Sequence, residues 1–353
     1  MLPLLTDELT RGQSLGDEQI AAAVTQLTAE EVAPQIKADF LIALAAKGET
    51  AAEITAFARE FRARSLQPPV DPELRGRQIL DVCGTGGDKL NTFNISTTVA
   101  LVAAAAGITV AKHGNRAITS NTGSADVLEA LGIPVNLSPA DAVRALREQQ
   151  FAFFFAPDYH PAYRNVGSAR RLCAERKQRT LFNFLGPLLN PVQPSAQLIG
   201  VPHPRLCEPI ALTLQALGVR RGMVVCGAVP AASGAPKDTW LDEFSILGDN
   251  HVAEFYHEKG FHQSVLELAH FPLQPAKLSD LAGGSPAENA GIIRRLLQGD
   301  ERGPKRDAVL LNAAAAIFVA GKCEDLIEAW EIAKDTIDSG KASRKLDSLA
   351  SAR

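Results

Sequence analysis

Through the first 70 residues, apolar positions recur at the spacing of amphipathic helices and are separated by residues that begin or end helices. Asp17 is a candidate N-cap for a helix through residues 20–27, and Gly48 follows an apolar run as a C-cap glycine would. Two segments have the Thr-x-x-Glu pattern of a capping box: Thr28–Glu31 and Thr50–Glu53. We expect a small helical domain over residues 1–70, ending in the proline-rich linker 66–72.

From Gln78 onward the pattern changes to short β-type runs that alternate with helical stretches. This alternation is typical of βαβ units around a mostly parallel sheet. The predicted strands are 79–83, 109–112, 151–156, 198–201 and 223–226, and the predicted helices between them are 97–106, 125–131, 140–148 and 206–217. We therefore predict an α/β fold, with a larger α/β domain over residues 75–353.

The C-terminal third begins with a predicted hairpin and continues with helices. The apolar segments 244–247 and 251–256 flank the turn-forming residues 248–250, which favours a β-hairpin. Helical patterns follow over residues 287–297, 308–320 and 324–337, and the sequence Asp338-Ser339-Gly340 predicts a stop for the last of them.

Two loops rich in glycine and polar residues follow predicted strands directly. The first is GTGGD at residues 84–88, followed by TFNIST at 92–97; the second is KHGNR at 112–116 and continues to Asp126. Glycines allow close approach of the backbone, and peptide N–H groups beside a helix N-terminus bind phosphate oxygens. The first loop matches neither G-x-G-x-x-G nor a Walker A sequence, so the spacing predicts neither function. A tight turn with capping residues, or a solvated loop, is the structural alternative.

Two further segments carry charge suited to ligands. The adjacent acids Asp242 and Glu243 follow Trp240-Leu241, and beside phosphate loops such a pair suits Mg²⁺, although acidic pairs are also common on surfaces. Arginines in the segment 160–179 suit the binding of a planar carboxylate. Among them we expect Arg171 to point to solvent. No Ser–His–Asp or Cys–His arrangement supports nucleophilic catalysis.

Composition excludes several classes of protein. The 353 residues are 46% hydrophobic and 22% charged, as in a globular enzyme, and the formal net charge of −4 excludes a generally basic surface for nucleic acid. No apolar run reaches the roughly 18–20 residues of a membrane span, and no signal peptide is evident. Five scattered cysteines form no C-x-x-C pair. We expect a cytoplasmic protein with neither nucleic acid nor membrane as a partner.

Taken together, the motifs resemble the anthranilate phosphoribosyltransferase family over essentially the whole chain. They occur in the same order: KGET at 47–50, GTGGD, NIST at 94–97, KHGNR, GSADVLEALG at 123–132, FNFLGPLLNP at 182–191, LDE at 241–243 and LLNAAAA at 310–316. The resemblance implies a nucleoside phosphorylase/phosphoribosyltransferase-like fold, with a segment near residues 165–190 returning to the helical domain. It also implies a homodimer, and it leaves room for a separate anthranilate synthase chain as a partner.

The activity implied by this resemblance is a step of tryptophan biosynthesis. It transfers the phosphoribosyl group of 5-phosphoribosyl-1-diphosphate to the amine of anthranilate and releases diphosphate. The implied donor-binding residues are Gly84, Gly87, Asp88, Thr92, Asn94, Ile95, Ser96, Thr97, Lys112, His113, Gly114, Asn115, Arg116, Ser120 and Ser124. The cofactor implied is Mg²⁺.

The resemblance also assigns the metal and acceptor sites. Mg²⁺ is expected at Ser96, Asp242 and Glu243, with Asp88 as a further contributor, and anthranilate at Gly84, Asn115 and Arg170, with His113 and Pro187 lining its channel. No residue is implied as a certain catalytic group, since Lys112, Asp242 and Glu243 act by charge and position. An aromatic amine is unprotonated at neutral pH and needs no general base.

The chain departs from the family pattern at a few positions. These are Lys89, Asn121-Thr122, Trp240, the longer loop 229–236 and about three extra residues between Arg170 and Arg179. Two other interpretations share the fold: a nucleic-acid-binding relative, which would need a basic stripe, and a pyrimidine nucleoside phosphorylase, which leaves the paired acids and Arg170 without a role.

Overall fold

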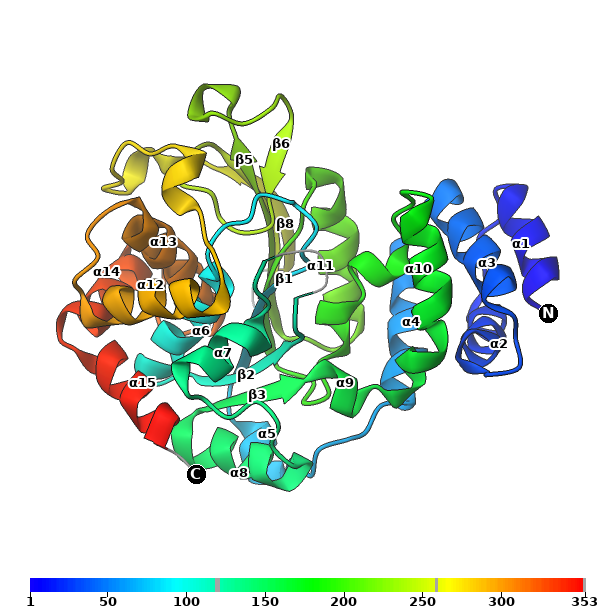
Figure 1. The fold of residues 1–353 in the computed structure, drawn as a ribbon, viewed down its shortest axis with the longest axis horizontal. Coiled ribbons are helices and arrows are strands. Elements are labelled where there is room, and N and C mark those ends of the chain that lie inside the picture. Colours follow the sequence, from blue (N-terminus) through cyan, green and yellow to red (C-terminus); the bar gives the residue numbers. More distant parts are fainter. Residues whose placement is uncertain (118–120, 258–259, 352–353) are drawn as a thin grey trace.

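The computed structural model describes residues 1–117, 121–257 and 260–351, and its chain forms a helical part beside a larger α/β part (Figure 1). The helical part contains α1 (Leu2–Thr10), α2 (Asp17–Thr28), α3 (Pro34–Lys47) and α4 (Ala51–Ala63). A later helix, α10 (Gly167–Glu175), packs against α3. The predicted fold class, a helical region followed by an α/β domain with a mostly parallel sheet, is confirmed.

One of the two predicted capping boxes forms and the other does not. The Thr50 side chain accepts from the Glu53 amide, and the Glu53 carboxylate accepts from the Thr50 amide, as the capping box requires. Thr28 instead is the last residue of α2, where its hydroxyl donates to the Val24 carbonyl at 2.8 Å. The prediction at Thr28 is therefore wrong. That at Asp17 is displaced by one residue, because Gly16 is the N-cap.

The sheet has the order β3-β2-β1-β4-β5-β7-β8, and β6 pairs with β5 outside this path. The strands β1, β2, β3, β4 and β5 run parallel, whereas β6, β7 and β8 are antiparallel to their neighbours. Their bounds are β1 (Ile79–Gly84), β2 (Thr109–Gly114), β3 (Phe151–Phe155), β4 (Ala196–Gly200), β5 (Arg221–Val229), β6 (Thr239–Leu241), β7 (Asn250–Tyr256) and β8 (Gly260–Leu266).

Helices cover both faces of this sheet (Figure 1). The helices of the α/β part, some of which pack on other helices rather than on the sheet, are α5 (Pro72–Gly76), α6 (Ile95–Ala105), α7 (Ser124–Leu131), α8 (Pro139–Gln149), α9 (Ala156–Tyr159), α11 (Cys207–Ala216), α12 (Pro286–Gln298), α13 (Pro304–Val319), α14 (Leu326–Asp338) and α15 (Lys341–Ser351). The predicted stop ends α14, but α15 follows it and was not anticipated.

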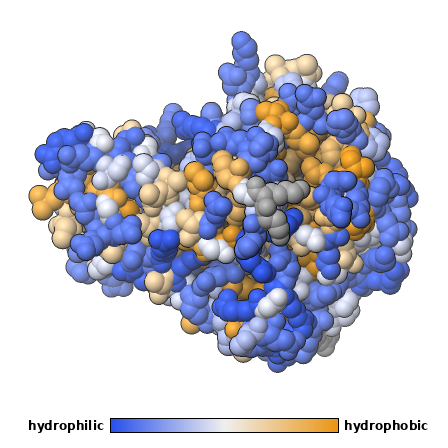
Figure 2. All heavy atoms as spheres, turned by 180° about the vertical axis from the view of Figure 1, so that it is seen from behind, coloured by the Kyte–Doolittle hydropathy of each residue, from blue (hydrophilic) through white to orange (hydrophobic). Residues whose placement is uncertain are grey.

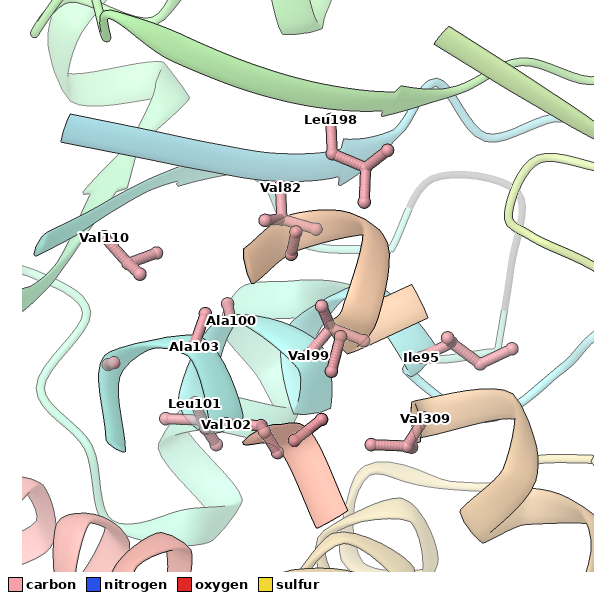
Figure 3. Close-up of a cluster of buried hydrophobic side chains, with 14 of the residues drawn as sticks. Val82, Ile95, Val99, Ala100, Leu101, Val102, Ala103, Val110, Leu198 and Val309 are labelled. Atoms are coloured by element: carbon pink, nitrogen blue, oxygen red, sulfur yellow. The ribbon is translucent and has the colours of Figure 1, made fainter. Parts of the chain in front are cut away.

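Helix α6 is the centre of the larger core. Figure 3 shows Val99, Ala100 and Ala103 of this helix among Val82 of β1 and Val309 of α13. A helix that is apolar on every side is stable only when other elements surround it, and sheet and helices do so here. The same packing holds the N-terminus of α6, where the NIST segment lies, against the end of the sheet.

The predicted hairpin of segments 244–247 and 251–256 is wrong. Strand β7 pairs with β5 and β8, and residues 244–247 form no strand. Buried Asn312 bonds both backbone groups of Phe244, accepting from its amide at 2.8 Å and donating to its carbonyl at 2.9 Å. The Asn250 side chain likewise accepts from the Ser245 amide. These side-chain amides satisfy the backbone that a strand partner would otherwise pair.

Within the described residues, no helix has both the length and the apolar character needed to cross a membrane.

Replacing Asn312 by Ala removes the partners of the two buried backbone groups of Phe244. We expect the free energy of unfolding to fall by about 2–4 kcal/mol, because each orphaned buried group costs about 1–3 kcal/mol. Urea denaturation of Asn312→Ala beside Gln298→Ala, an amide exposed on α12, measures this. Equal midpoints for the two variants would contradict the role of Asn312.

Candidate active site

The two glycine-rich loops lie side by side, since β1 ends at Gly84 and its neighbour β2 at Gly114. Strand β4, on the other side of β1, ends at Gly200. In open α/β sheets the carboxyl ends of the strands form the ligand-binding edge. The fold therefore brings the predicted phosphate loops to one place.

The acidic pair meets this edge through extremely close packing. A Cβ on Gly84 would lie 2.4 Å from Asp242 Oδ2, and one on Gly200 would lie 1.7 Å from the Asp242 carbonyl oxygen. Asp242 Oδ2 also accepts from the Gly86 amide at 2.5 Å. Only glycine fits at positions 84 and 200. The missing side chain of Gly84 makes room for the Asp242 carboxylate, and that of Gly200 makes room for the Asp242 main chain.

Negative charge accumulates at this point. Asp242 and Glu243 are 8% and 9% exposed. Burial raises the pKa of Asp242 well above its usual range, and the neighbouring Asp88 and Glu243 carboxylates raise it further. Burial also raises the pKa of Glu243, against the lowering effect of Lys112 and of the Ser96 amide, which donates to Glu243 at 3.1 Å. An arrangement that penalises its own ionised carboxylates favours a bound cation.

Lys112 is the buried cation opposite these acids. Its ammonium donates to the Val82 carbonyl at 2.7 Å and to Ser96 Oγ at 3.4 Å, and the residue is 1% exposed. Burial lowers its pKa, and Cys83, Asp81 and Glu243 oppose that shift. Lys112 and Ser96 thus lie together, with Glu243 next to Ser96.

The NIST segment is held by a region that sequence reasoning missed. Asn94 Oδ1 accepts from the Asn289 side chain at 2.9 Å, and Asn289 Oδ1 accepts from the Gly284 amide at 2.8 Å. Thr92 forms an isolated bridge with Ala282. The available signal was Gly283-Gly284 before a Ser-x-x-Glu capping box, but nothing local linked it to Asn94. Ile95 and Thr97 are buried within α6.

The residues predicted to bind the donor in the second loop differ in exposure and in their contacts. Ser124 Oγ donates to the carbonyl of exposed Asn115 at 3.2 Å, and a Cβ on Gly114 would lie 2.2 Å from that hydroxyl. Arg116 is bonded to Glu129 at 2.6 Å and to Asp126 at 3.2 Å, so its guanidinium faces α7. Ser120 lies outside the described residues. The donor roles of these residues stay predictions.

Arg170 lies on the helical side, with its guanidinium carbon 5.4 Å from the centre of the Phe182 ring. It has no hydrogen bond or ion pair with the described residues, and burial lowers its pKa. The Tyr163 hydroxyl, which opposes this shift, is itself buried without a partner in the described part of the chain. A half-buried, unpaired guanidinium suits a carboxylate ligand.

An aromatic row joins this region to β2. The rings of His113 and His160 are 5.3 Å apart, and those of His160 and Tyr163 are 5.5 Å apart. Among the described residues, buried polar atoms without a partner along the row are His113 Nε2, His160 Nε2, Tyr163 Oη and Arg62 Nη2. Burial lowers the pKa of both histidines, so each is neutral. Orphaned polar atoms mark a ligand or water site, and sequence reasoning had given His160 and Tyr163 no such role.

The neighbouring residues Lys112 and His113 belong to different halves of the site. Successive residues of a strand point to opposite faces of the sheet. Lys112 accordingly meets Ser96 of α6, whereas His113 lies on the opposite face, where β2 contacts the 3₁₀ turn Gly186–Leu189 with its buried Pro187. The end of β2 therefore has two different faces. Lys112 lies on the face with the acidic pair, and His113 lies on the face with the aromatic row.

Two of the departures from the family pattern adjoin the site in the sequence: Lys89 follows the GTGGD loop, and Trp240 precedes Leu241 and the acidic pair. Lys89 is exposed with φ +62°, and Trp240 packs between the rings of His203 and His251. Across the described ranges, no group of three or more His, Cys, Asp or Glu residues is arranged to hold a metal ion. A Mg²⁺ site here would draw on two carboxylates and on substrate oxygens, which suits that ion.

The chain is similar to known proteins in both of its parts. Residues 76–343 match the glycosyl transferase family a/b domain, and residues 4–65 match its helical bundle domain. The anthranilate phosphoribosyltransferase of Petrotoga mobilis is 41% identical over 97% of this chain and 94% of its own length. The chain belongs to the anthranilate phosphoribosyltransferase family.

Solved structures agree with this assignment. The anthranilate phosphoribosyltransferase of Thermus thermophilus superimposes with a TM-score of 0.86 at 40% identity, covering 98% of each chain. The enzyme of Saccharomyces cerevisiae, solved in complex with PRPP and Mg, has a TM-score of 0.84 at 27% identity, covering 99% of this chain and 98% of that one.

Asp242→Asn removes one buried charge from the acidic cluster and keeps the shape of the side chain. At a pH above the raised pKa of Asp242, where its carboxylate is ionised, we expect the melting temperature of the ligand-free protein to rise by about 2 °C, because about 1 kcal/mol of desolvation and repulsion is relieved. Scanning fluorimetry with and without MgCl₂ and the phosphoribosyl donor tests this. The variant should lose most of the added stabilisation that the wild type gains. Asp249→Asn, an exposed acid, is the control and should behave as wild type.

Proposed function

We propose that this chain transfers the phosphoribosyl group of 5-phosphoribosyl-1-diphosphate to the amine of anthranilate and releases diphosphate. The observation that carries the proposal is the meeting of two glycine-rich loops with a buried acidic pair at one sheet edge. On the helical side, Arg170 has no hydrogen bond or ion pair with the described residues. Membership of the anthranilate phosphoribosyltransferase family supports it. The product belongs to tryptophan biosynthesis.

In this proposal the donor lies over the ends of β1 and β2. Backbone groups and hydroxyls hold its phosphate oxygens, with the residues predicted from the sequence as ligands. Lys112 is already desolvated and fixed by the Val82 carbonyl, so it stabilises charge that develops on the leaving diphosphate without reorganising. Arg116, paired with Glu129, would have to exchange partners to reach the donor.

Mg²⁺ is the proposed cofactor, held by Ser96, Asp242 and Glu243, with Asp88 close by. The fit is supported by the carboxylates themselves, whose pKa values are raised by burial and mutual repulsion. A bound Mg²⁺ supplies positive charge opposite the diphosphate oxygens. The protein contributes the fixed, buried geometry that keeps both carboxylates at the edge of the sheet.

Anthranilate is proposed to lie on the aromatic side of β2. Arg170 binds its carboxylate, and His113, His160 and Tyr163 line the ring with apolar faces and unsatisfied polar atoms. The acceptor amine is unprotonated at neutral pH. The main task of the acceptor side is therefore to position the amine in line with the breaking bond.

A homodimer through the helical part is a further component of the proposal. Figure 2 shows apolar surface at the free end of that part. Leu4 of α1 is 66% exposed and Ile36 of the adjacent α3 is 39% exposed. Large exposed apolar side chains gathered on one domain favour contact with another protein surface.

A cytoplasmic location is also proposed, in accord with five unpaired cysteines. Association with a separate anthranilate synthase chain stays a prediction.

Anthranilate fluorescence tests the reaction. We expect Mg²⁺-dependent loss of fluorescence in the presence of the donor. Arg170→Ala should raise KM for anthranilate at least about tenfold, because a charge-assisted bond to a carboxylate is worth about 1.5–3 kcal/mol. Arg171→Ala, exposed on the same helix, is the matched control. Absence of turnover together with phosphorolysis of thymidine would instead support a pyrimidine nucleoside phosphorylase.

The dimer is tested by changing its proposed surface. Leu4→Glu combined with Ile36→Glu places charges on exposed positions of α1 and α3, so folding should be retained while self-association is lost. Sedimentation velocity should show a dimer for the wild type and a monomer for the double variant. A wild type that sediments as a monomer across micromolar concentrations would refute the dimer.

A further inference from the structure

The side chain of Arg179 extends from the helical side of the molecule and reaches the loop that follows β1. It stands between α10 and the 3₁₀ turn Leu181–Asn183. Cys173 before it and Leu181 after it belong to the core shared with α1–α4. From this anchored segment its guanidinium donates a hydrogen bond to the carbonyl of Gly87. The contact joins residues 92 positions apart in the chain.

Gly87 is a position at which the loop backbone needs an external support. Gly86 and Gly87 have φ of +77° and +88°, and such glycines have many alternative conformations. A Cβ on Gly87 would lie 2.9 Å from Arg179 Nη2, so the guanidinium fits directly against the bare backbone. The loop is therefore clamped twice, at the Gly86 amide by Asp242 and at the Gly87 carbonyl by Arg179.

These contacts fix the orientation of the next peptide. The peptide unit is planar and trans, so the Asp88 N–H points opposite to the Gly87 carbonyl that Arg179 holds. Asp242 and Arg179 come from distant parts of the chain, and each orients one peptide of the loop. A phosphate loop that is ordered beforehand binds its ligand without a further cost in conformational entropy.

We propose that Arg179 is a positioning residue for the phosphoribosyl donor, acting by holding the GTGGD loop through the Gly87 carbonyl. The proposal rests on the proposed function for the identity of the ligand. It does not require contact between Arg179 and the reacting atoms. It also assigns a role to the segment after α10, which the family resemblance had linked only to the helical domain.

Arg179→Ala and Arg179→Lys test this, with Lys177→Gln as the matched control because Lys177 is exposed two residues away. Calorimetry with the donor and MgCl₂ should show affinity weakened about three- to tenfold in Arg179→Ala, the effect of losing one ordinary hydrogen bond at an exposed site. Arg179→Lys should recover part of the loss, since an ammonium also donates to a carbonyl. KM for anthranilate should change less than about twofold, because Arg179 holds the donor loop and not the acceptor side.

A direct readout of the loop comes from Lys89, which is exposed within it. In the absence of donor, trypsin should cleave after Lys89 faster in Arg179→Ala than in Lys177→Gln, because the loop is no longer held. The two variants should have equal melting temperatures, so that the difference in cleavage reports the loop and not global unfolding. Equal cleavage rates and equal donor affinities would overturn the proposal. Weakened donor binding with unchanged cleavage would also overturn it, because Arg179 would then act on the donor by charge. If the wild type binds no donor, the proposed function fails, and the cleavage rates alone decide the role of Arg179.

Discussion

The carboxylate of Asp242 lies against backbone that has no side chains, and the arrangement of the site depends on this contact. Gly84 at the end of β1 and Gly200 at the end of β4 leave the space that Asp242 occupies. The bond from the Gly86 amide then ties the acid to the phosphate loop. Any side chain at either glycine would displace Asp242 and, with it, the adjacent Glu243. The close approach of three chain segments is therefore a condition for the charge arrangement that follows.

That charge arrangement is costly in the ligand-free protein. Asp242 and Glu243 are withdrawn from water beside Asp88, and Lys112 is buried with neutral oxygen atoms as its hydrogen-bond partners. Such groups are retained at functional sites, where a ligand supplies the missing partners. The aromatic side of β2 shows the same feature in neutral form, with orphaned atoms on His113, His160 and Tyr163 among the described residues. One half of the site thus contains buried charges that a ligand would balance. The other half contains buried neutral polar atoms that a ligand would hydrogen-bond.

Local signals in the sequence succeeded where one segment satisfies its own hydrogen bonds. Thr50 and Glu53 cap α4 reciprocally, as their capping-box pattern predicts. They failed where another group, distant or within the same helix, takes over the bonding. Asn312, 68 residues from Phe244, occupies the backbone groups that a predicted strand would have used. Thr28 has the residue pattern of a cap but bonds within its own helix.

The residue pattern is enough to predict the alternation of strands and helices, the two glycine-rich loops and the acids and arginines suited to phosphate, metal and carboxylate. These features follow from residue spacing and local chemistry, which are present in any short stretch of chain. Which of these features come into contact depends on how the chain folds. Asp242 contacts Gly86 across 156 residues, Asn289 contacts Asn94 across 195, and Arg179 reaches Gly87 across 92. Such pairings depend on the packing of β1, β4, α6 and α10 around shared cores, and no local pattern records which distant backbone group a side chain will satisfy.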